Sequence, residues 1–389
     1  MNVEDQAMPS AGDTVAVGMS GGVDSTLTAL MLARKGCRII GITMSLWDGS
    51  LPAQKSGRPL QESCFGPGEK KNINECREFC AAHGIEYHVI DVKEQYKKEV
   101  LGYFKREYRN GRTPNPCIRC NQMIKFGALL DGVQKLGISF DYFCTGHYAR
   151  VVRPYKGVFN SNVRPYMIAG AEDVSKDQTY FLYRVPSELL EKVRFPLAQM
   201  KKKDVFALAE QLHLEAAQRK ESQDFIGEEY FDLLFSDTPS KPGNIIDLDG
   251  HILGRHRGIE HYTVGQRRGL GVALNYPVYV HSIDVKSNSV ILAPNDALFS
   301  AGLIADDFLW PGNIEPSGPI EALVKIRLAS RPVKARIERL ENPGQTGKYN
   351  GTPWKILFES PQRAVAPGQS AVLYDDGVII GGGVIAETI

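Results

Sequence analysis

The stretch Thr14-Val-Ala-Val-Gly-Met-Ser-Gly-Gly-Val-Asp-Ser25 decides the fold that we expect for this chain. Its first five residues are typical of a short buried strand, and the run from Ser25 to Lys35 favours a helix. Glycines at 21 and 22 let the backbone approach a ligand closely, and the N–H groups at the start of a helix attract anions. The stretch therefore predicts a phosphate-binding loop between a strand and a helix.

This loop differs from the usual nucleotide P-loop. It lacks the Gly-Lys-Ser/Thr ending in which a lysine reaches the terminal phosphates. It carries Asp24 instead, which we expect to help hold a Mg²⁺ ion that shields the charge of pyrophosphate. A tight turn with a helix cap is the alternative, and the flanking strand and helix disfavour it.

The rest of the chain predicts three domains. Apolar runs at 38–44, 87–92 and 141–147 alternate with helical stretches, which favours a parallel α/β sheet with ligands at the carboxyl ends of its strands. Beyond about residue 215, Gly and Pro separate short apolar runs, and from about 298 the runs suggest a compact barrel. We predict a Rossmann-like α/β domain over 1–215, a small β-rich domain over 216–297 and a C-terminal β-barrel over 298–389.

Composition excludes several classes of protein. A formal charge of +1 argues against binding to nucleic acid through bulk charge, so RNA contact must come from particular segments. The sequence has no apolar run near the ~20 residues of a membrane span and no secretory signal at its start, so we expect a cytoplasmic protein without a membrane partner. Seven cysteines, an odd number, do not indicate a disulfide framework.

Two motifs carry a resemblance to a known family. Residues 20–25 resemble the pyrophosphate loop of ATP pyrophosphatases, and Gly111-Arg-Thr-Pro-Asn-Pro-Cys-Ile-Arg-Cys-Asn-Gln-Met-Ile-Lys-Phe126 resembles the catalytic segment of bacterial tRNA-specific 2-thiouridylases. Stretches 145–150, 176–182, 263–270 and 366–369 agree in order. The resemblance implies a transferase that uses ATP to adenylate the C2 carbonyl of the wobble uridine of tRNA and then replaces the oxygen with sulfur, releasing AMP and pyrophosphate.

The resemblance also implies roles for individual residues. Cys120 takes the position of the nucleophile, with Cys117 beside it. The positions that match the family's ATP contacts are Gly18, Met19, Ser20, Gly21, Gly22, Val23, Asp24, Ser25, Met44 and Gly146. Those that match its tRNA contacts are Asn115, Pro116, Cys117, Lys176, Asp177, Gln178 and Arg327. The family uses an Arg-Tyr pair in its barrel where this chain has Arg327-Leu328, which puts the aromatic contact in doubt.

The sulfur chemistry departs from the family pattern. Many members have aspartate at the position of Cys117 and a second essential cysteine downstream, whereas the corresponding stretch 220–228 has none and no cysteine follows Cys144. In one alternative, Cys117 and Cys120 form a redox pair that a persulfide carrier protein supplies with sulfur. In the other, they join Cys64 to hold an iron–sulfur cluster whose open iron site takes sulfide.

Other assignments for the cysteines and charged groups stay open beside these. Zinc on the same three thiols and a structural role for Cys64 are further alternatives. Cys37, Cys76, Cys80 and Cys144 are interpreted as core residues. His147 is either a base or part of the loop structure, and the run Lys201-Lys-Lys203 is interpreted as solvated surface.

Two rival functions remain. Another pyrophosphate-loop ligase would need no pair of cysteines, so Cys117 and Cys120 argue against it. An RNA-binding homologue that has lost sulfur transfer is suggested by the missing downstream cysteine, but the intact phosphate loop argues against it.

Overall fold

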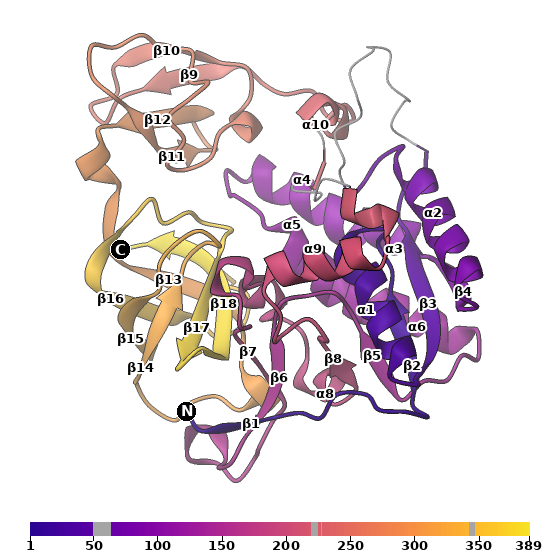
Figure 1. Cartoon of the computed structure of the whole chain (residues 1–389). Coiled ribbons are helices and arrows are strands. Elements are labelled where there is room, and N and C mark those ends of the chain that lie inside the picture. The colour runs from indigo at the N-terminus through magenta and orange to yellow at the C-terminus, as the bar shows by residue number, and fades with distance from the viewer. Residues whose placement is uncertain (50–63, 219–224, 227, 342–346) are drawn as a thin grey trace. The chain divides into compact units, whose positions relative to one another are not determined.

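The chain forms two compact units in a computed structural model that describes all residues except 50–63, 219–224, 227 and 342–346 (Figure 1). The first unit contains Met1–Val100, Cys117–Leu233 and Asp376–Ile379. The second contains Leu101–Pro116, Leu234–Asp375 and Ile380–Ile389. Among the described residues, no helix is both long and apolar enough to cross a membrane.

A parallel sheet forms the centre of the first unit, as the sequence predicted. Its strands follow the order β4 (Glu86–Asp91), β3 (Arg38–Ser45), β2 (Thr14–Gly18), β5 (Tyr142–Cys144) and β8 (Val193–Arg194). The side chains of 15–17 in β2 have no exposed area, which explains why this strand is a continuous apolar run. Because β5 pairs directly with β2, the loops after these two strands lie at the same edge.

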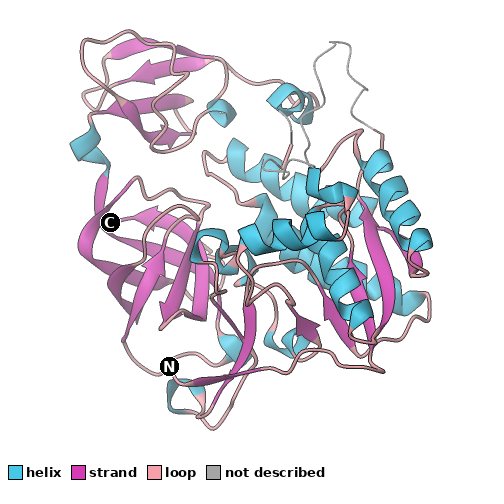
Figure 2. Cartoon of the chain, in the orientation of Figure 1, coloured by secondary structure: helices cyan, strands magenta, loops and turns pink. Residues whose placement is uncertain are grey.

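Helices cover both faces of this sheet (Figure 2). α1 (Val23–Arg34) and α2 (Glu69–Ala82) pack on one face, where Leu32 and Cys80 meet Val17. On the other face, Phe126 from the π-helix η2 (Asn121–Ala128) meets Phe143 of β5 edge to face at 5.7 Å. The remaining α-helices of the unit are α3 (Lys93–Tyr96), α5 (Pro116–Cys120), α6 (Leu129–Lys135), α7 (Thr179–Leu182), α8 (Ser187–Leu190) and α9 (Lys202–Gln211), with η1 (Lys97–Leu101) and α10 (Glu228–Leu234) at its boundaries.

The predicted core cysteines are confirmed. Cys37, Cys76, Cys80 and Cys144 are buried in one apolar cluster with Val15. Burial raises the pKa of the Cys80 thiol to about 12. These four thiols therefore behave as small apolar side chains.

An antiparallel group of strands completes the first unit and was not predicted. It contains β1 (Val3–Asp5), β6 (Arg150–Pro154) and β7 (Met167–Ala169), and Val378 pairs with Ala169 at its edge. The strands are short, and their partners are up to about two hundred positions apart, so the local pattern does not reveal them.

The second unit contains a small sheet and a barrel. The sheet has the order β10 (Ile252–His256), β9 (Gly243–Ile246), β12 (Ser289–Ala293), β11 (Tyr279–Asp284). The barrel strands are β13 (Phe299–Leu309), β14 (Ile320–Lys325), β15 (Val333–Arg339), β16 (Trp354–Arg363), β17 (Ser370–Asp375) and β18 (Val378–Thr388), and the β18–β17 pairing closes it. α4 (Gly102–Arg109) belongs to this unit. The β-rich region and the C-terminal barrel are confirmed.

We predict that Leu27→Ala destabilises the first unit, because Leu27 on α1 is fully buried in an apolar cluster with residues of α9. The expected loss is about 2 to 5 kcal/mol of unfolding free energy, measured by chemical denaturation. Leu136→Ala is the control, since Leu136 is 59% exposed and its truncation leaves no cavity. Equal stability of the two variants would contradict the packing described for α1.

Candidate functional site

The phosphate-binding loop joins β2 to α1 and is fixed at both ends. The backbone N–H of Met19 donates to the Ile42 carbonyl at 2.7 Å, and the Ser20 N–H donates to Ser25 Oγ at 3.2 Å. Gly21 has a φ of 80°, which side chains rarely adopt, and Gly22 is the N-cap of α1. The first-turn amides of α1 are thereby presented at the carboxyl edge of the sheet, where an anion would bind.

Some of the predicted ATP-binding residues are buried and others are exposed. Met19 and Val23 are buried, so they would act through their backbone. Ser20 is exposed, and its hydroxyl lies 3.3 Å from that of Ser25. Met44 lies near the end of β3, paired with Ile90 of β4, which places it at the same edge of the sheet.

Asp24 makes the strongest polar contacts of the loop. Lys202, in the first turn of α9, places its ammonium 2.8 Å from both carboxylate oxygens, and the Tyr148 hydroxyl donates to Oδ1 at 2.9 Å. The interpretation of Lys202 as solvated surface is wrong, because its side chain is only 9% exposed. Its neighbours Lys201 and Lys203 are exposed, as expected for the run.

Gly146 explains how the loop after β5 approaches the phosphate loop. A Cβ atom on Gly146 would lie 2.7 Å from the Asp24 Cβ and 2.9 Å from the Ser25 backbone nitrogen. The sequence interpretation required a small residue here for a backbone contact to AMP. The structure gives another reason for a small residue at 146: any side chain there would collide with the first turn of α1.

The predicted sulfur residues lie on α5. Cys117 is exposed and Cys120 is half-buried, one helical turn apart. Although the Cys117 side chain keeps access to water, the protein packed around α5 partly desolvates both thiols, which raises the pKa of Cys117 to about 11 and that of Cys120 to about 12. The charge of Lys125 lowers both pKa values. At neutral pH both groups are therefore mostly protonated, and a thiolate needs further stabilisation.

Cys64 lies within electrostatic range of the same pair. Desolvation raises its pKa and the charge of Lys125 lowers it, while a thiolate at Cys64 raises the pKa of both Cys117 and Cys120. The preceding residues 62 and 63 lie outside the described part of the chain, as does most of the stretch 220–228.

Lys125 connects the thiols to the edge of the sheet. Its ammonium lies 3.3 Å from Nε2 of His147, and Nδ1 of that ring lies 2.6 Å from the Thr145 hydroxyl. Desolvation, with the charge of Lys125 second, holds the pKa of His147 well below its usual range. The imidazole is therefore neutral and accepts from Lys125 through Nε2, which suits a positioning role better than that of a strong base.

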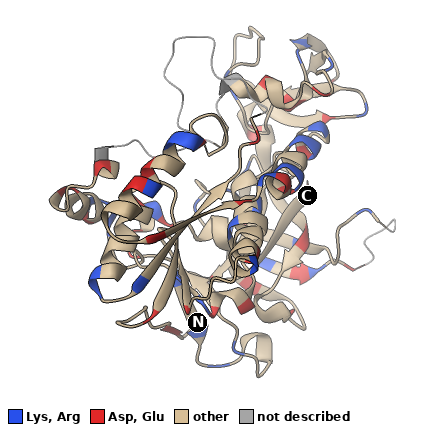
Figure 3. Cartoon of the chain, turned by 90° about the vertical axis from the view of Figure 1, so that its right-hand side faces the viewer, with Lys and Arg blue, Asp and Glu red and all other residues tan. Residues whose placement is uncertain are grey.

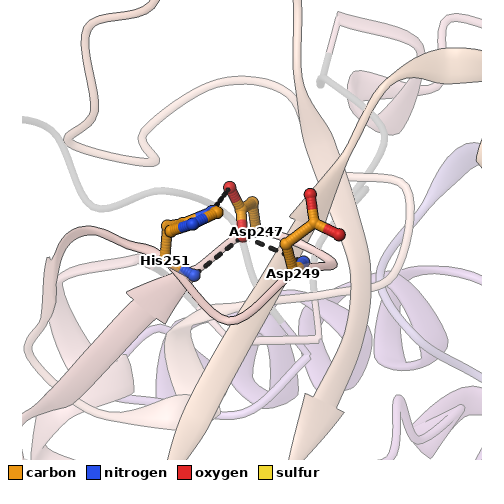
Figure 4. Close-up of side chains that lie close together, drawn as sticks. All are labelled: Asp247, Asp249 and His251. Carbon is orange, nitrogen blue, oxygen red and sulfur yellow. Dashed lines mark hydrogen bonds and ion pairs between the residues drawn. The ribbon is translucent and has the colours of Figure 1, made fainter.

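Closely grouped metal-ligand atoms occur elsewhere among the described residues. Asp247, Asp249 and His251 place one ligand atom each within 4.8 Å of one another at the turn between β9 and β10, whereas the three thiols do not form such a group (Figure 4). Asp247 accepts bonds from the backbone N–H groups of Asp249 and His251, and it lies 3.0 Å from the His251 ring. These contacts explain the group as an exposed turn.

The predicted tRNA contacts around Lys176 are partly used by the fold. Asp177 accepts from the backbone N–H of Thr179 at 3.1 Å and from that of Ala171 at 3.3 Å. Gln178 Oε1 accepts from the Tyr148 N–H at 3.0 Å. Asp177 and Gln178 thus hold this loop beside Tyr148, and direct contact with RNA stays a prediction for all three.

The motif 111–126 is divided between the two units, and the boundary falls after Pro116. Within the second unit, the Thr113 N–H donates to the Pro367 carbonyl at 2.7 Å, and Gln369 donates to the carbonyls of Thr113 and Pro114. Asn115 and Pro116 therefore follow a segment that the turn 366–369 fixes. Arg327 lies in a loop after β14 and donates to the Ala364 carbonyl in the same unit.

Both signs of charge are interspersed along the chain (Figure 3). The cations that contact the residues of the site are two single lysines, Lys125 and Lys202. Lys125 and Lys202 were not recognised from the sequence, the first because it stood within a longer motif and the second because it stood within a charge run. The regular spacing of α9 was the available signal, since Lys202 shares a face with the buried Val205 and Ala209.

Family models match almost the whole chain. A tRNA methyl transferase HUP domain matches residues 13–228, a tRNA methyl transferase PRC-barrel domain matches 232–294 and an aminomethyltransferase beta-barrel domain matches 300–385. Together with the phosphate loop, these matches define a HUP-domain enzyme of the tRNA-modifying class.

Curated relatives narrow the class. A tRNA-specific 2-thiouridylase MnmA of Endomicrobium trichonymphae is 42% identical over 373 residues, covering 95% of this chain and 98% of the relative. One of Acetivibrio thermocellus is 38% identical over 376 residues, with the same shares covered. The chain belongs to the tRNA-specific 2-thiouridylase family.

Solved structures show weaker likenesses. The U34-tRNA thiolase NcsA of Methanococcus maripaludis with its [4Fe-4S] cluster gives a TM-score of 0.32 at 18% identity, covering 59% of this chain and 68% of that one. A 4-thiouridine synthetase in complex with RNA and ATP gives 0.33 at 15% identity, covering 55% and 44%. At these scores, neither likeness bears on the chemistry of this chain.

We predict that Gly146→Ala weakens binding of MgATP by about tenfold or more, because the new methyl group displaces the first turn of α1. Calorimetric titration with MgATP measures the loss. Gly68→Ala is the matched control, since Gly68 has open space for a Cβ and an ordinary helical backbone. Unchanged affinity in Gly146→Ala would refute the close contact as a requirement of the site.

Proposed function

We propose that this protein is a tRNA uridine 2-sulfurtransferase that activates the wobble uridine at the phosphate loop and carries its sulfur chemistry on Cys117 and Cys120. Membership of the 2-thiouridylase family supports the activity. One observation supports the assignment of residues. Gly146 contacts Asp24 of the phosphate loop, and the next residue, His147, contacts Lys125, whose charge acts on both thiols.

In the activation step, the amides at the start of α1 would bind the phosphates of ATP, and Asp24 would hold Mg²⁺. The C2 carbonyl oxygen of the uridine bonds to the α-phosphorus, the bond from that phosphorus to the bridging oxygen breaks, and its electron pair leaves with pyrophosphate. The N3 proton of the uracil passes to water. The carbonyl oxygen is then part of a good leaving group, AMP.

In the relay, the outer sulfur of a persulfide on one of Cys117 and Cys120 would attack C2 and displace AMP. The thiolate of the other cysteine would then attack the inner sulfur and break the S–S bond, which leaves sulfur on the uridine and a Cys117–Cys120 disulfide for a thiol reductant to reopen. The neutral thiols at these positions are poor nucleophiles, because thiolate is the reactive form. Lys125 favours the thiolate by its charge, and His147 fixes the position of Lys125 through the 3.3 Å contact. Asn115 and Pro116, at the start of the same motif, would contact the target base.

As the alternative to the relay, we propose that Cys64, Cys117 and Cys120 hold an iron–sulfur cluster, in which case these cysteines are ligands and not the carriers of the sulfur. Charge on Cys64 raises the pKa of both Cys117 and Cys120, so the three thiols lie within electrostatic range of one another. Soft thiolates are the usual ligands of such clusters, and a metal deprotonates a thiol that desolvation would keep neutral. When bound, a cluster with three cysteine ligands would supply an open iron site for sulfide.

For the tRNA, we propose contacts by Lys176, Asp177 and Gln178 in the first unit and by Arg327 in the barrel. The domain boundaries near residues 215 and 297 stay part of the proposal, as does a location in the cytoplasm.

We predict that cells lacking this protein have tRNA without 2-thiouridine at the wobble position, measured by mass spectrometry of tRNA digests. The wild-type gene and Cys37→Ala should restore the modification, because Cys37 lies in the core cluster away from α5. Cys120→Ser should not restore it. Unchanged 2-thiouridine in the deletion strain would refute the function.

We predict that anaerobically purified protein contains iron and acid-labile sulfide, and that Cys64→Ala loses both together with the visible absorbance of the cluster. Cys37→Ala controls for the removal of a thiol outside the site and should keep its iron. Iron-free protein with full activity would refute the cluster and favour the relay between Cys117 and Cys120. A Cys117–Cys120 disulfide after one turnover would then be expected.

A further inference from the structure

The phosphate loop contains no cation of its own between Ser20 and Ser25, although the pyrophosphate part of ATP carries several negative charges. The amides of α1 contribute only partial charges. Lys202 brings a full positive charge to this loop from 178 positions further along the chain, with its Nζ 2.8 Å from either oxygen of Asp24.

The position of Lys202 is fixed by several contacts within the first unit. Its backbone N–H donates to Asp173 Oδ2 at 2.9 Å, which secures the start of α9. Its ammonium lies 4.9 Å from the ring centroid of Phe206 and 5.5 Å from that of Tyr148. These two aromatic rings lie beside the ammonium and help to fix it next to the Asp24 carboxylate.

A contribution to folding stability does not by itself explain the ion pair between Lys202 and Asp24. The desolvation of a nearly buried ion pair offsets most of its Coulomb attraction, so such a pair adds little to folding. The pair also occupies the carboxylate that Mg²⁺ would need. A divalent cation bound to Asp24 would displace the Lys202 ammonium from this carboxylate and free it for a phosphate beside the amides of α1.

We propose that Lys202 binds the pyrophosphate part of ATP and stabilises pyrophosphate as it leaves, while Asp24 passes from Lys202 to Mg²⁺. This inference rests on the proposed function and assigns it a further substrate-binding residue. Lys202 forms and breaks no covalent bond. The electron pair of the broken phosphorus–oxygen bond stays on the pyrophosphate oxygen, and the ammonium balances that growing charge.

The test compares wild type with Lys202→Met, Lys202→Arg and Lys203→Met. Lys203 is the matched control, because it is exposed and adjacent on the same helix. Calorimetry with magnesium pyrophosphate and, separately, with AMP measures binding without tRNA. Lys202→Met should weaken pyrophosphate binding by about tenfold or more and leave AMP binding unchanged. Lys202→Arg should recover most of the affinity, and Lys203→Met should match wild type.

Kinetics give a second readout. The tRNA-dependent exchange of labelled pyrophosphate into ATP should fall by roughly 10² to 10³ in Lys202→Met, the usual loss when one group that stabilises a transition-state charge is removed. An unchanged pyrophosphate affinity would overturn the inference. So would an equal loss of pyrophosphate and AMP binding with a lower melting temperature, because that pattern means a structural role.

The outcome for Lys202 is separable from the proposed function. Pyrophosphate binding is measured on the full chain without tRNA, so it decides the role of Lys202 whatever the enzyme does to uridine. Absence of tRNA-dependent exchange in the wild type would instead count against the sulfurtransferase.

Discussion

The close contact between Gly146 and the first turn of α1 is the constraint on which the rest of the site depends. Because no side chain separates the two backbones, the loop after β5 lies directly against Asp24. Tyr148 can then reach the Asp24 carboxylate, and His147 can reach Lys125. Because residue 146 has no Cβ, a chain of contacts runs from the phosphate loop through His147 to Lys125, which follows Cys117 and Cys120 in the sequence.

The sequence was sufficient for the features that depend on local pattern. The apolar run of β2, the glycines at 21 and 22 and the alternation of strands and helices predicted the parallel sheet and the place of the loop. The i, i+4 spacing of Cys76 and Cys80 predicted their burial on one helix face. Each of these inferences uses residues within one element or two consecutive ones.

The features that the sequence did not reveal depend on distant partners. Lys202 looks like any lysine in a charge run until α9 packs against α1, because its partner Asp24 is 178 positions away. The same holds for β1, whose partner β6 begins about 150 residues later. The pKa shifts of the thiols are also invisible in the sequence, since desolvation depends on which segments fold around α5.

The way the chain alternates between its two units has a consequence for how such proteins can change. The segment Leu101–Pro116 belongs to the barrel-containing unit although it lies within the first half of the chain, and Asp376–Ile379 returns to the sheet-containing unit near the end. Neither unit is a contiguous piece of the gene. A crossover at either apparent boundary would leave each product with a foreign fragment and without one of its own. No single uninterrupted segment therefore contains a whole unit, and a truncation at either boundary removes part of the unit that is kept.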